Sequence, residues 1–331
     1  MKNILIINWG RKAASTTITY FFIKSLIKKF NVFHSISLES DYYIETQILN
    51  KNCINISTYQ GKLSFILNSI FFYFKNKKKI INYVKEKKIR VVIFPMFHIW
   101  NFFIIKELNN LNIKTIFCNH DASLHPGEKS LFINFLLKFM INNSMAHIVF
   151  SDHVYTQLKE IVFTRNIGIK KLPLPPIVNI DYEKKLKSIK KDKISIIFFG
   201  RLLKYKGIEL LLDSIFQIQD KINIHLTIAG FGNLATYNKK INKIRNIQIY
   251  NTWLNDNDII KLFDKNDVCI LPYLESSQSG VVPISFMTGT PIIATAVGGL
   301  KEQITNNYNG VIVDKNTQSI NDAILSIYNN Q

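Results

Sequence analysis

The chain has 331 residues, 47% of them hydrophobic, with 42 Lys and Arg against 23 Asp and Glu. That hydrophobic content excludes a disordered protein, and the length suits two domains. The net charge of +19 indicates a negatively charged partner, which leaves nucleic acid, an anionic membrane or a phosphorylated substrate. The three cysteines, Cys53, Cys118 and Cys269, form neither a metal-binding nor a disulfide pattern, which favours free thiols in a reducing cytoplasm.

The first half alternates short apolar runs with longer amphipathic ones, a pattern that predicts a doubly wound parallel sheet. The expected strands cover residues 4–7, 91–94, 113–118 and 147–150. The expected helices cover residues 17–30, 63–87, 101–108, 129–141 and 153–160. The first apolar run is too short for a signal peptide, and no run reaches the roughly 18 residues that cross a bilayer. We therefore expect a soluble or peripheral protein.

The composition changes near residue 170, where three prolines precede a densely charged stretch. This change predicts a first domain over residues 1–175, a linker over 176–193 and a second domain over 194–331. Strands in the second domain are expected at 194–199, 222–229, 247–250, 268–271, 291–295 and 311–313. Helices are expected at 207–217, 256–263, 280–288 and 320–328. The predicted fold class is α/β, with two Rossmann-like domains facing each other across a cleft.

Two cations, Arg201 and Lys206, lie between the predicted strand 194–199 and the helix that follows. In open α/β sheets, the carboxyl ends of the strands are where ligands bind. An Arg and a Lys near a helix N-terminus suit a phosphate or a diphosphate. A solvated basic turn in a basic protein explains the same residues, and this stretch alone does not decide between the two.

Small and polar residues follow two other predicted strands. Gly230 and Gly232 would let a ligand lie close to the backbone, although a tight strand-to-helix turn requires the same residues. The turn from Ser277 to Gly280 opens a helix, so its N–H groups and hydroxyls could bind a phosphate. Capping of the helix by Ser277 or Ser279 is compatible with that interpretation.

The order of these motifs is similar to that in the C-terminal domain of family-4 glycosyltransferases, which have the GT-B fold. The matching motifs are Gly200-Arg201 with Lys206-Gly207, AGFG at 229–232, DVCILP at 267–272, SGVVP at 279–283, GTPIIAT at 289–295 and VGGLKE at 297–302. The resemblance implies a nucleoside-diphosphate-sugar donor whose diphosphate is held by Arg201 and Lys206. It implies further donor contacts at Gly200, Gly230, Gly232, Trp253, Ser277, Gln278, Ser279, Gly280 and Val281, with Trp253 near the base.

The chain departs from the family pattern in one respect. The family often carries two glutamates separated by seven residues, one contacting the donor sugar and the other the ribose. Alignment on Gly280 places Ser277 and Ser285 at those positions. Backbone amides and serine hydroxyls could still bind the donor. Asp256-Asn257-Asp258 matches the Asp-x-Asp metal motif of the other glycosyltransferase fold, but its position predicts a helix N-terminus, and no metal or cofactor is expected.

In the first half, His120 follows the predicted strand 113–118, at a position suited to a ligand contact or to a bond with neighbouring backbone. The resemblance implies that His120 approaches the transferred sugar. Asp121 would orient it or meet the acceptor. His98 and Gly10 end two other predicted strands and are the further acceptor-side candidates.

Aromatic residues at 71–74 stand beside a dense run of lysines within residues 75–88. This combination suits the surface of an anionic membrane. A core helix with a solvated basic end is the alternative. The first interpretation predicts a cytoplasmic protein that is peripheral at the inner face of the cell membrane.

The leading hypothesis is a retaining, metal-independent hexosyltransferase that moves a sugar from a nucleoside-diphosphate sugar to a saccharide or lipid-linked acceptor. The expected setting is bacterial surface polysaccharide synthesis. The absent glutamate pair motivates one alternative, a catalytically silent sugar-nucleotide or polyanion-binding protein. The basic charge motivates another, a nucleic-acid-binding protein, but the basic residues are dispersed and the sequence contains no recognised nucleic-acid motif.

Overall fold

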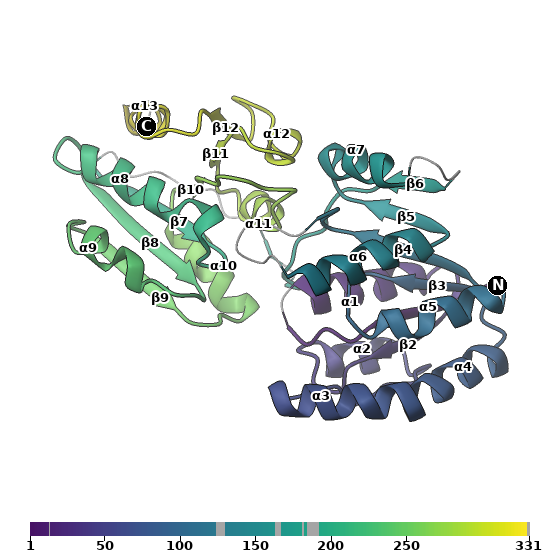
Figure 1. Cartoon of the computed structure of the whole chain (residues 1–331). Coiled ribbons are helices and arrows are strands. Elements are labelled where there is room, and N and C mark those ends of the chain that lie inside the picture. Colours follow the sequence, from purple (N-terminus) through teal and green to yellow (C-terminus); the bar gives the residue numbers. More distant parts are fainter. Residues whose placement is uncertain (13, 124–129, 163–166, 181, 184–191, 330–331) are drawn as a thin grey trace. The chain divides into compact units, whose positions relative to one another are not determined.

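The computed structural model describes residues 1–12, 14–123, 130–162, 167–180, 182–183 and 192–329. The chain forms two compact units, the first ending at Pro175 and the second starting at Pro176 (Figure 1). We call them unit 1 and unit 2. Each unit is built on one six-stranded parallel sheet with helices around it. The predicted α/β class and the two Rossmann-like sheets are confirmed.

The sheet of unit 1 has the strand order β2-β1-β3-β4-β5-β6. Its strands are β1 (Asn3–Asn8), β2 (Asn31–Ile36), β3 (Val91–Phe94), β4 (Lys114–Asn119), β5 (Ala146–Val149) and β6 (Gly168–Lys171). Its helices are α1 (Ala14–Leu26), α2 (Tyr43–Leu49), α3 (Lys62–Phe71), α4 (Lys77–Glu86), α5 (Asn101–Asn110), α6 (Leu131–Asn143) and α7 (Asp152–Ile161). A π-helical turn, η1 (Phe72–Asn76), joins α3 to α4.

The first strand shows why both faces of this sheet are covered. Leu5 and Ile7 belong to one apolar cluster, and Ile4 and Ile6 belong to another. Successive side chains of a strand point to opposite faces, so an unbroken apolar run must be buried on both sides. The run Ile4–Ile7 therefore specifies a sheet with helices on both faces.

Two strands of unit 1 were not predicted, because neither is an apolar run. In β2, two buried polar residues bond to backbone groups: His34 Nε2 lies 2.8 Å from the Asn50 carbonyl oxygen, and Ser35 Oγ donates to the Ile54 carbonyl over 2.8 Å. The edge strand β6 has the sequence GIKK and is largely exposed. The predicted helix 17–30 also ends earlier, at Leu26.

The sheet of unit 2 has the strand order β12-β11-β10-β7-β8-β9. Its strands are β7 (Ile194–Phe199), β8 (Ile224–Gly230), β9 (Ile247–Asn251), β10 (Val268–Leu271), β11 (Ile292–Thr295) and β12 (Gly310–Val313). Its helices are α8 (Ile208–Ile218), α9 (Asn238–Ile241), α10 (Asp256–Lys265), α11 (Val281–Met287), α12 (Leu300–Gln303) and α13 (Thr317–Asn329), with 3-10 turns η2 (Lys204–Lys206) and η3 (Ala235–Tyr237). All six predicted strands are present.

The start of the predicted linker packs into unit 2. Val178 is buried in the apolar core of that unit, and the Asn179 amide donates to an Asp256 carboxylate oxygen over 2.8 Å. Residues 181 and 184–191 of the predicted linker lie outside the described residues. Across the part of the chain that the structure describes, no helix is both long and apolar enough to span a bilayer.

Candidate functional site

The sheet of unit 2 reverses its strand order between β7 and β10. The chain leaves β7 for its neighbour β8 and later returns to place β10 on the other side of β7. In open α/β sheets, ligands bind outside the carboxyl ends of the strands at such a switch point. The turn after β7 carries Arg201 and Lys206, and the loop after β10 carries residues 273–280. The sheet topology therefore brings these two predicted segments to one edge.

A backbone contact fixes the turn after β7 to the loop after β10. Gly207 has φ +71°, and a Cβ atom there would lie 1.8 Å from the Pro272 carbonyl oxygen. The Leu274 amide donates to the Tyr205 carbonyl over 2.7 Å. Position 207 requires glycine both for its left-handed backbone and for this approach. The turn that carries Lys206 is consequently held against Pro272 and Leu274.

Both predicted cations contact Tyr205, and Lys206 also contacts Tyr273. Arg201 Nη2 donates to the Tyr205 hydroxyl over 3.1 Å. Lys206 Nζ lies 3.7 Å from the centroid of the Tyr273 ring and 5.1 Å from that of Tyr205. Both rings are buried, whereas Arg201 is exposed and Lys206 is half-buried. An aromatic face attracts an ammonium group without cancelling its charge, so this arrangement holds positive charge at the sheet edge.

Tyr273 was not predicted as a site residue. Its side chain is fully buried, and burial raises its pKa, while the bond with Ser279 and the charge of Arg201 act in the opposite direction. The Tyr273 phenol therefore stays neutral and protonated at physiological pH. In the sequence, Tyr273 lies near a predicted strand end but is neither charged nor a glycine, so no local pattern marks it as a ligand contact.

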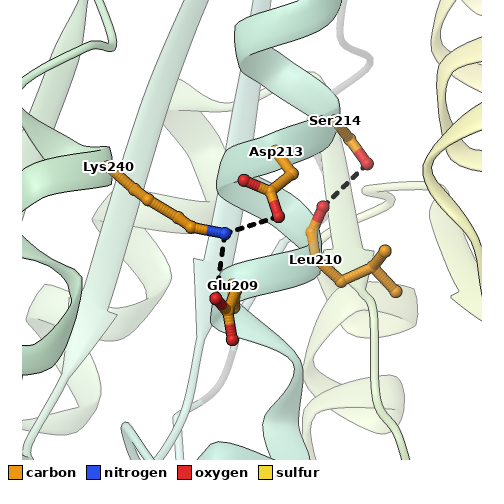
Figure 2. A network of polar contacts seen from close by, with 5 residues as sticks. All are labelled: Glu209, Leu210, Asp213, Ser214 and Lys240. Atoms are coloured by element: carbon orange, nitrogen blue, oxygen red, sulfur yellow. Dashed lines mark hydrogen bonds and ion pairs between the residues drawn. The ribbon is translucent and has the colours of Figure 1, made fainter.

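Glu209, the acidic residue that follows the turn with Lys206, forms an ion pair with Lys240. Glu209, in the first turn of α8, accepts from Lys240 Nζ at 2.9 Å, and Asp213 accepts from the same ammonium at 2.7 Å. Figure 2 shows Lys240 reaching α8 between the two carboxylates. The bond from Lys240 is the main cause that lowers the pKa of Glu209, so its carboxylate is ionised and bound at neutral pH.

The glycines after β8 pack against protein backbone. A Cβ atom on Gly230 would lie 1.8 Å from the Gly200 carbonyl oxygen, and one on Gly232 would lie 2.7 Å from Leu202 Cβ. The Leu202 amide also donates to the Phe231 carbonyl over 3.1 Å. Close packing of the two strand ends thus accounts for both glycines.

Ser279 is the central residue of the loop after β10. Its hydroxyl lies 3.2 Å from the Tyr273 hydroxyl and accepts from the Val281 amide over 3.3 Å. Gln303 of α12 donates to the Ser279 carbonyl over 3.1 Å and accepts from its amide over 2.8 Å. The predicted capping role of Ser279 fits this geometry. Its backbone N–H group is bound to Gln303, which corrects the expectation that this amide is open for a phosphate.

The remaining predicted donor residues lie on the same edge with varied exposure. Ser277 is buried, Gln278 is half-buried, and Gly280 immediately precedes α11. Ser285 is fully buried and donates to the Thr290 carbonyl over 2.7 Å, so it serves the turn between α11 and β11. Trp253 is 48% exposed and follows β9, the edge strand.

The segment Asp256-Asn257-Asp258 forms the first turn of α10, as predicted. The cap is the preceding Asn255, whose side chain accepts from the Asp258 amide over 2.9 Å. Acidic residues in a first turn are stabilised by the helix dipole. Within the described residues, no group of three potential ligands could hold a metal ion.

The sheet of unit 1 has its own switch point, between β1 and β3. Gly10 follows β1, and a Cβ atom there would lie 2.0 Å from Ser15 Oγ. Asn8 accepts from the Gly10 amide over 3.0 Å and donates to the Ser15 carbonyl over 2.8 Å. Gly10 therefore lies in a turn that is tied to the start of α1. Asn8, a buried polar residue at a strand end, was missed as the residue that fixes this turn.

His98, which follows β3, is a core residue. It is 8% exposed, and its ring centroid lies 5.9 Å from that of Trp9 and 5.2 Å from that of Trp100. The Trp100 amide donates to His98 Nδ1 over 3.2 Å, so the proton of the neutral ring is on Nε2. Burial lowers the pKa of His98 to about 3.

His120 follows β4 and is half-buried. Its Nε2 lies 3.2 Å from the Pro95 carbonyl oxygen, and its ring packs on Phe150 with centroids 4.6 Å apart. A carbonyl only accepts, so Nε2 carries the proton. Burial lowers the pKa of His120, against the opposing effects of Asp121 and of the bond to Pro95. The ring is therefore neutral at physiological pH.

The architecture of the whole chain is similar to that of solved glycosyltransferases. It matches sucrose-phosphate synthase from Thermosynechococcus elongatus with a TM-score of 0.76 and 15% identity, over 99% of this chain and 90% of that one. It matches Anabaena Alr3699/HepE, solved with UDP, with a TM-score of 0.72 and 13% identity, over 100% and 91% of the two chains. The two parallel six-stranded sheets with their surrounding helices are the GT-B fold.

The family match lies within unit 2. Residues 179–331 match the family "Glycosyl transferases group 1". An uncharacterized glycosyltransferase of Methanocaldococcus jannaschii is 31% identical over 153 residues, and an uncharacterized 41.2 kDa protein in the cps region of Klebsiella pneumoniae is 31% identical over 145 residues. The aligned parts cover 43% and 41% of this chain and 39% of each relative. Residues 179–331 are therefore similar to the glycosyltransferase group 1 family.

Proposed function

We propose that this protein transfers a hexose, with retention, from a nucleoside-diphosphate sugar to a saccharide or lipid-linked acceptor. The observation that carries the proposal is that Arg201 and Lys206 both contact Tyr205 at the switch point of unit 2, where Lys206 also lies over the Tyr273 ring. Structures of similar fold contain UDP and UDP-glucose, which supports a nucleotide-sugar donor. The relative in the cps region supports a place in bacterial surface polysaccharide synthesis.

The two cations serve the departing diphosphate. Transfer breaks the bond between the anomeric carbon and a diphosphate oxygen, and negative charge develops on that oxygen. Arg201 offers a planar set of N–H donors, and Lys206 offers a compact charge on a rigid aromatic support. Because both are positioned before the reaction, they stabilise this charge without reorganisation and without requiring a metal ion.

The remaining donor contacts are assigned along the same edge. Gly200, Gly230 and Gly232 would contribute to donor binding through their backbone, and residues 277–281 would face the sugar and the phosphates. Trp253 would meet the base, because its exposed indole can stack on a nucleobase. Ser285 is engaged in the turn before β11, so the ribose contact must come from another group.

Unit 1 would supply the acceptor side. His120 is neutral, with its proton on Nε2, so Nδ1 is the acceptor nitrogen of the ring. We assign His120 to the transferred sugar, with Asp121 beside it, and Gly10 to the acceptor. His98 would act through packing, since its ring is enclosed by aromatic side chains.

The test compares Arg201→Ala and Lys206→Ala with Lys204→Ala, which removes an exposed cation of the same turn. Thermal stabilisation by a panel of nucleotide sugars, beginning with UDP-glucose, first identifies the donor. Each of the first two variants should lose about 10²–10³ in donor turnover, and Lys204→Ala should keep it. Unchanged turnover in both site variants would refute the proposed mechanism.

The same assay separates the enzyme from a silent binding protein. The serines that replace the glutamate pair motivate that alternative, because Ser277 and Ser285 are both buried. A wild-type protein that is stabilised by a donor, but neither transfers nor hydrolyses it above background, would be the silent binding protein.

A further inference from the structure

The helical run α3–η1–α4 of unit 1 is attached to the domain by one face. Phe72 is fully buried and stacks on Trp100 with ring centroids 4.7 Å apart. Ser69 Oγ accepts from Trp100 Nε1 over 2.7 Å, and Asn68 donates to the Thr58 carbonyl. Figure 1 shows α3 and α4 as a single long helical rod along unit 1. The inward face of the rod is therefore defined by Asn68, Ser69 and Phe72.

The opposite face of α3 and η1 exposes large apolar side chains to solvent. Leu63 is 80% exposed, Leu67 is 66% exposed and Phe74 is 67% exposed. Ile66 and Ile70 are also exposed by more than half. Intervals of three and four residues place these side chains in one stripe along a helix. A continuous apolar stripe on a solvent-exposed surface indicates a site that binds another protein or a membrane.

Positive charge borders this stripe. Residues 62–85 contain six lysines and no aspartate or glutamate. Lys75, Lys78, Lys79 and Lys85 are exposed, and Lys75 Nζ lies 5.3 Å from the centroid of the Phe71 ring. Lys77, by contrast, pairs with Glu107 of α5 at 2.6 Å. Apolar and cationic groups are thus presented together on one rod.

We propose that this surface, defined by Leu63, Ile66, Leu67, Ile70, Phe74 and the exposed lysines, binds an anionic lipid bilayer. The rod lies parallel to the membrane plane. Its apolar stripe enters the boundary between headgroups and acyl chains, and its lysines contact lipid phosphates. This inference is independent of the proposed enzymatic function, since none of these residues belongs to the candidate donor or acceptor sites.

The charge favours a bilayer over a second copy of the chain as the occupant. If two copies associated through this surface, the exposed lysines of one copy would lie close to those of the other. Repulsion between like charges across an interface would destabilise such a dimer. An anionic membrane supplies both an apolar layer for the stripe and negative charge for the lysines.

The test is co-sedimentation of the full-length protein with vesicles of phosphatidylcholine and phosphatidylglycerol, and with vesicles of phosphatidylcholine alone. Wild-type protein should bind the anionic vesicles at low salt, and binding should weaken as salt is raised. The double variant L67E/F74E should lower the partition coefficient at least about tenfold, because it removes two apolar anchors and adds repulsive charge. Replacing Lys75, Lys78 and Lys79 with glutamine should lower it roughly fivefold per lysine.

The matched control is Phe216→Glu on α8 of unit 2. Phe216 is 48% exposed, so this variant makes the same chemical change on a helix outside the proposed surface. It should bind vesicles as the wild type does. Circular dichroism and thermal unfolding establish that each variant is folded. The proposal is overturned if wild-type protein ignores anionic vesicles at low salt, or if L67E/F74E binds them unchanged. It is also overturned if L67E/F74E differs from wild type only in self-association and not in vesicle binding.

Discussion

The ammonium group of Lys206 lies 3.7 Å from the centre of the Tyr273 ring, although the two residues follow different strands. β7 precedes Lys206 and β10 precedes Tyr273, and these strands are neighbours in the sheet. The contact therefore exists only because the strand order reverses between them. The buried Tyr273 ring limits the positions that the Lys206 ammonium group can take. An anion-binding site needs a positive charge whose position is fixed before the anion binds.

Replacement of Tyr273 tests that relationship directly. Tyr273→Phe keeps the ring and removes the hydroxyl that meets Ser279, so donor affinity should change by less than about threefold. Tyr273→Leu removes the ring and should weaken donor binding about tenfold or more, since a desolvated cation–π contact contributes about 2 kcal/mol. Isothermal titration with UDP or the identified donor measures both. Equal affinities for the two variants would show that the ring does not position Lys206.

Gly207 should tolerate no side chain. Gly207→Ala places a Cβ atom against the Pro272 carbonyl and forces alanine into a left-handed conformation, so we expect a loss of about 2 kcal/mol or more in unfolding free energy. Gly168→Ala is the control, because nothing lies within 4 Å of a Cβ atom there. Urea denaturation compares the two. A loss as small as that of Gly168→Ala would mean that the turn can move away from Pro272.

Strands with a continuous apolar run were predictable from the sequence, whereas β2 and β6 were not. The run Ile194–Phe199 is recognisable because a central parallel strand has no polar face. β2 escaped notice because His34 and Ser35 are paired with backbone groups far along the chain. Such pairing depends on tertiary structure, so no local pattern reports it.

Some residues of the candidate site were likewise predictable from local sequence, and others were not. Arg201 and Lys206 stand out locally, because charged residues directly after a buried strand are conspicuous. Tyr273 and Gln303 do not, because their roles depend on which strand ends are neighbours. Gly230 illustrates a third case: its identity was conspicuous, but packing against Gly200 accounts for it as well as a ligand would.

Buried His98 should make stability depend on pH. Its folded pKa of about 3 lies below the ordinary value of 6.5, so the unfolded chain binds more protons between these values. The contribution of His98 is complete above about pH 6.5 and is lost as the pH falls toward 3. Between pH 7 and pH 5 it should account for about 2 kcal/mol of lost stability.

The measurement compares the unfolding free energy of wild type and of His98→Gln at both pH values. The variant is less stable overall, but its loss between pH 7 and pH 5 should be smaller than that of wild type by about 2 kcal/mol. An identical pH dependence in the two proteins would show that His98 is accessible to protons in the folded state.

His120 should make transfer activity insensitive to pH over the range in which free histidine titrates. Because burial lowers its pKa below 6.5, the ring remains neutral as the pH falls through that value. The acidic limb that belongs to His120 in the profile of kcat/KM should therefore lie below pH 6.5. His120→Asn should lower kcat and abolish that limb, whereas Lys204→Ala, with an exposed cation removed from unit 2, should retain both. An inflection at or above pH 6.5 that disappears in His120→Asn would show that the ring is protonated in the working enzyme, and the role assigned to neutral His120 would then be wrong.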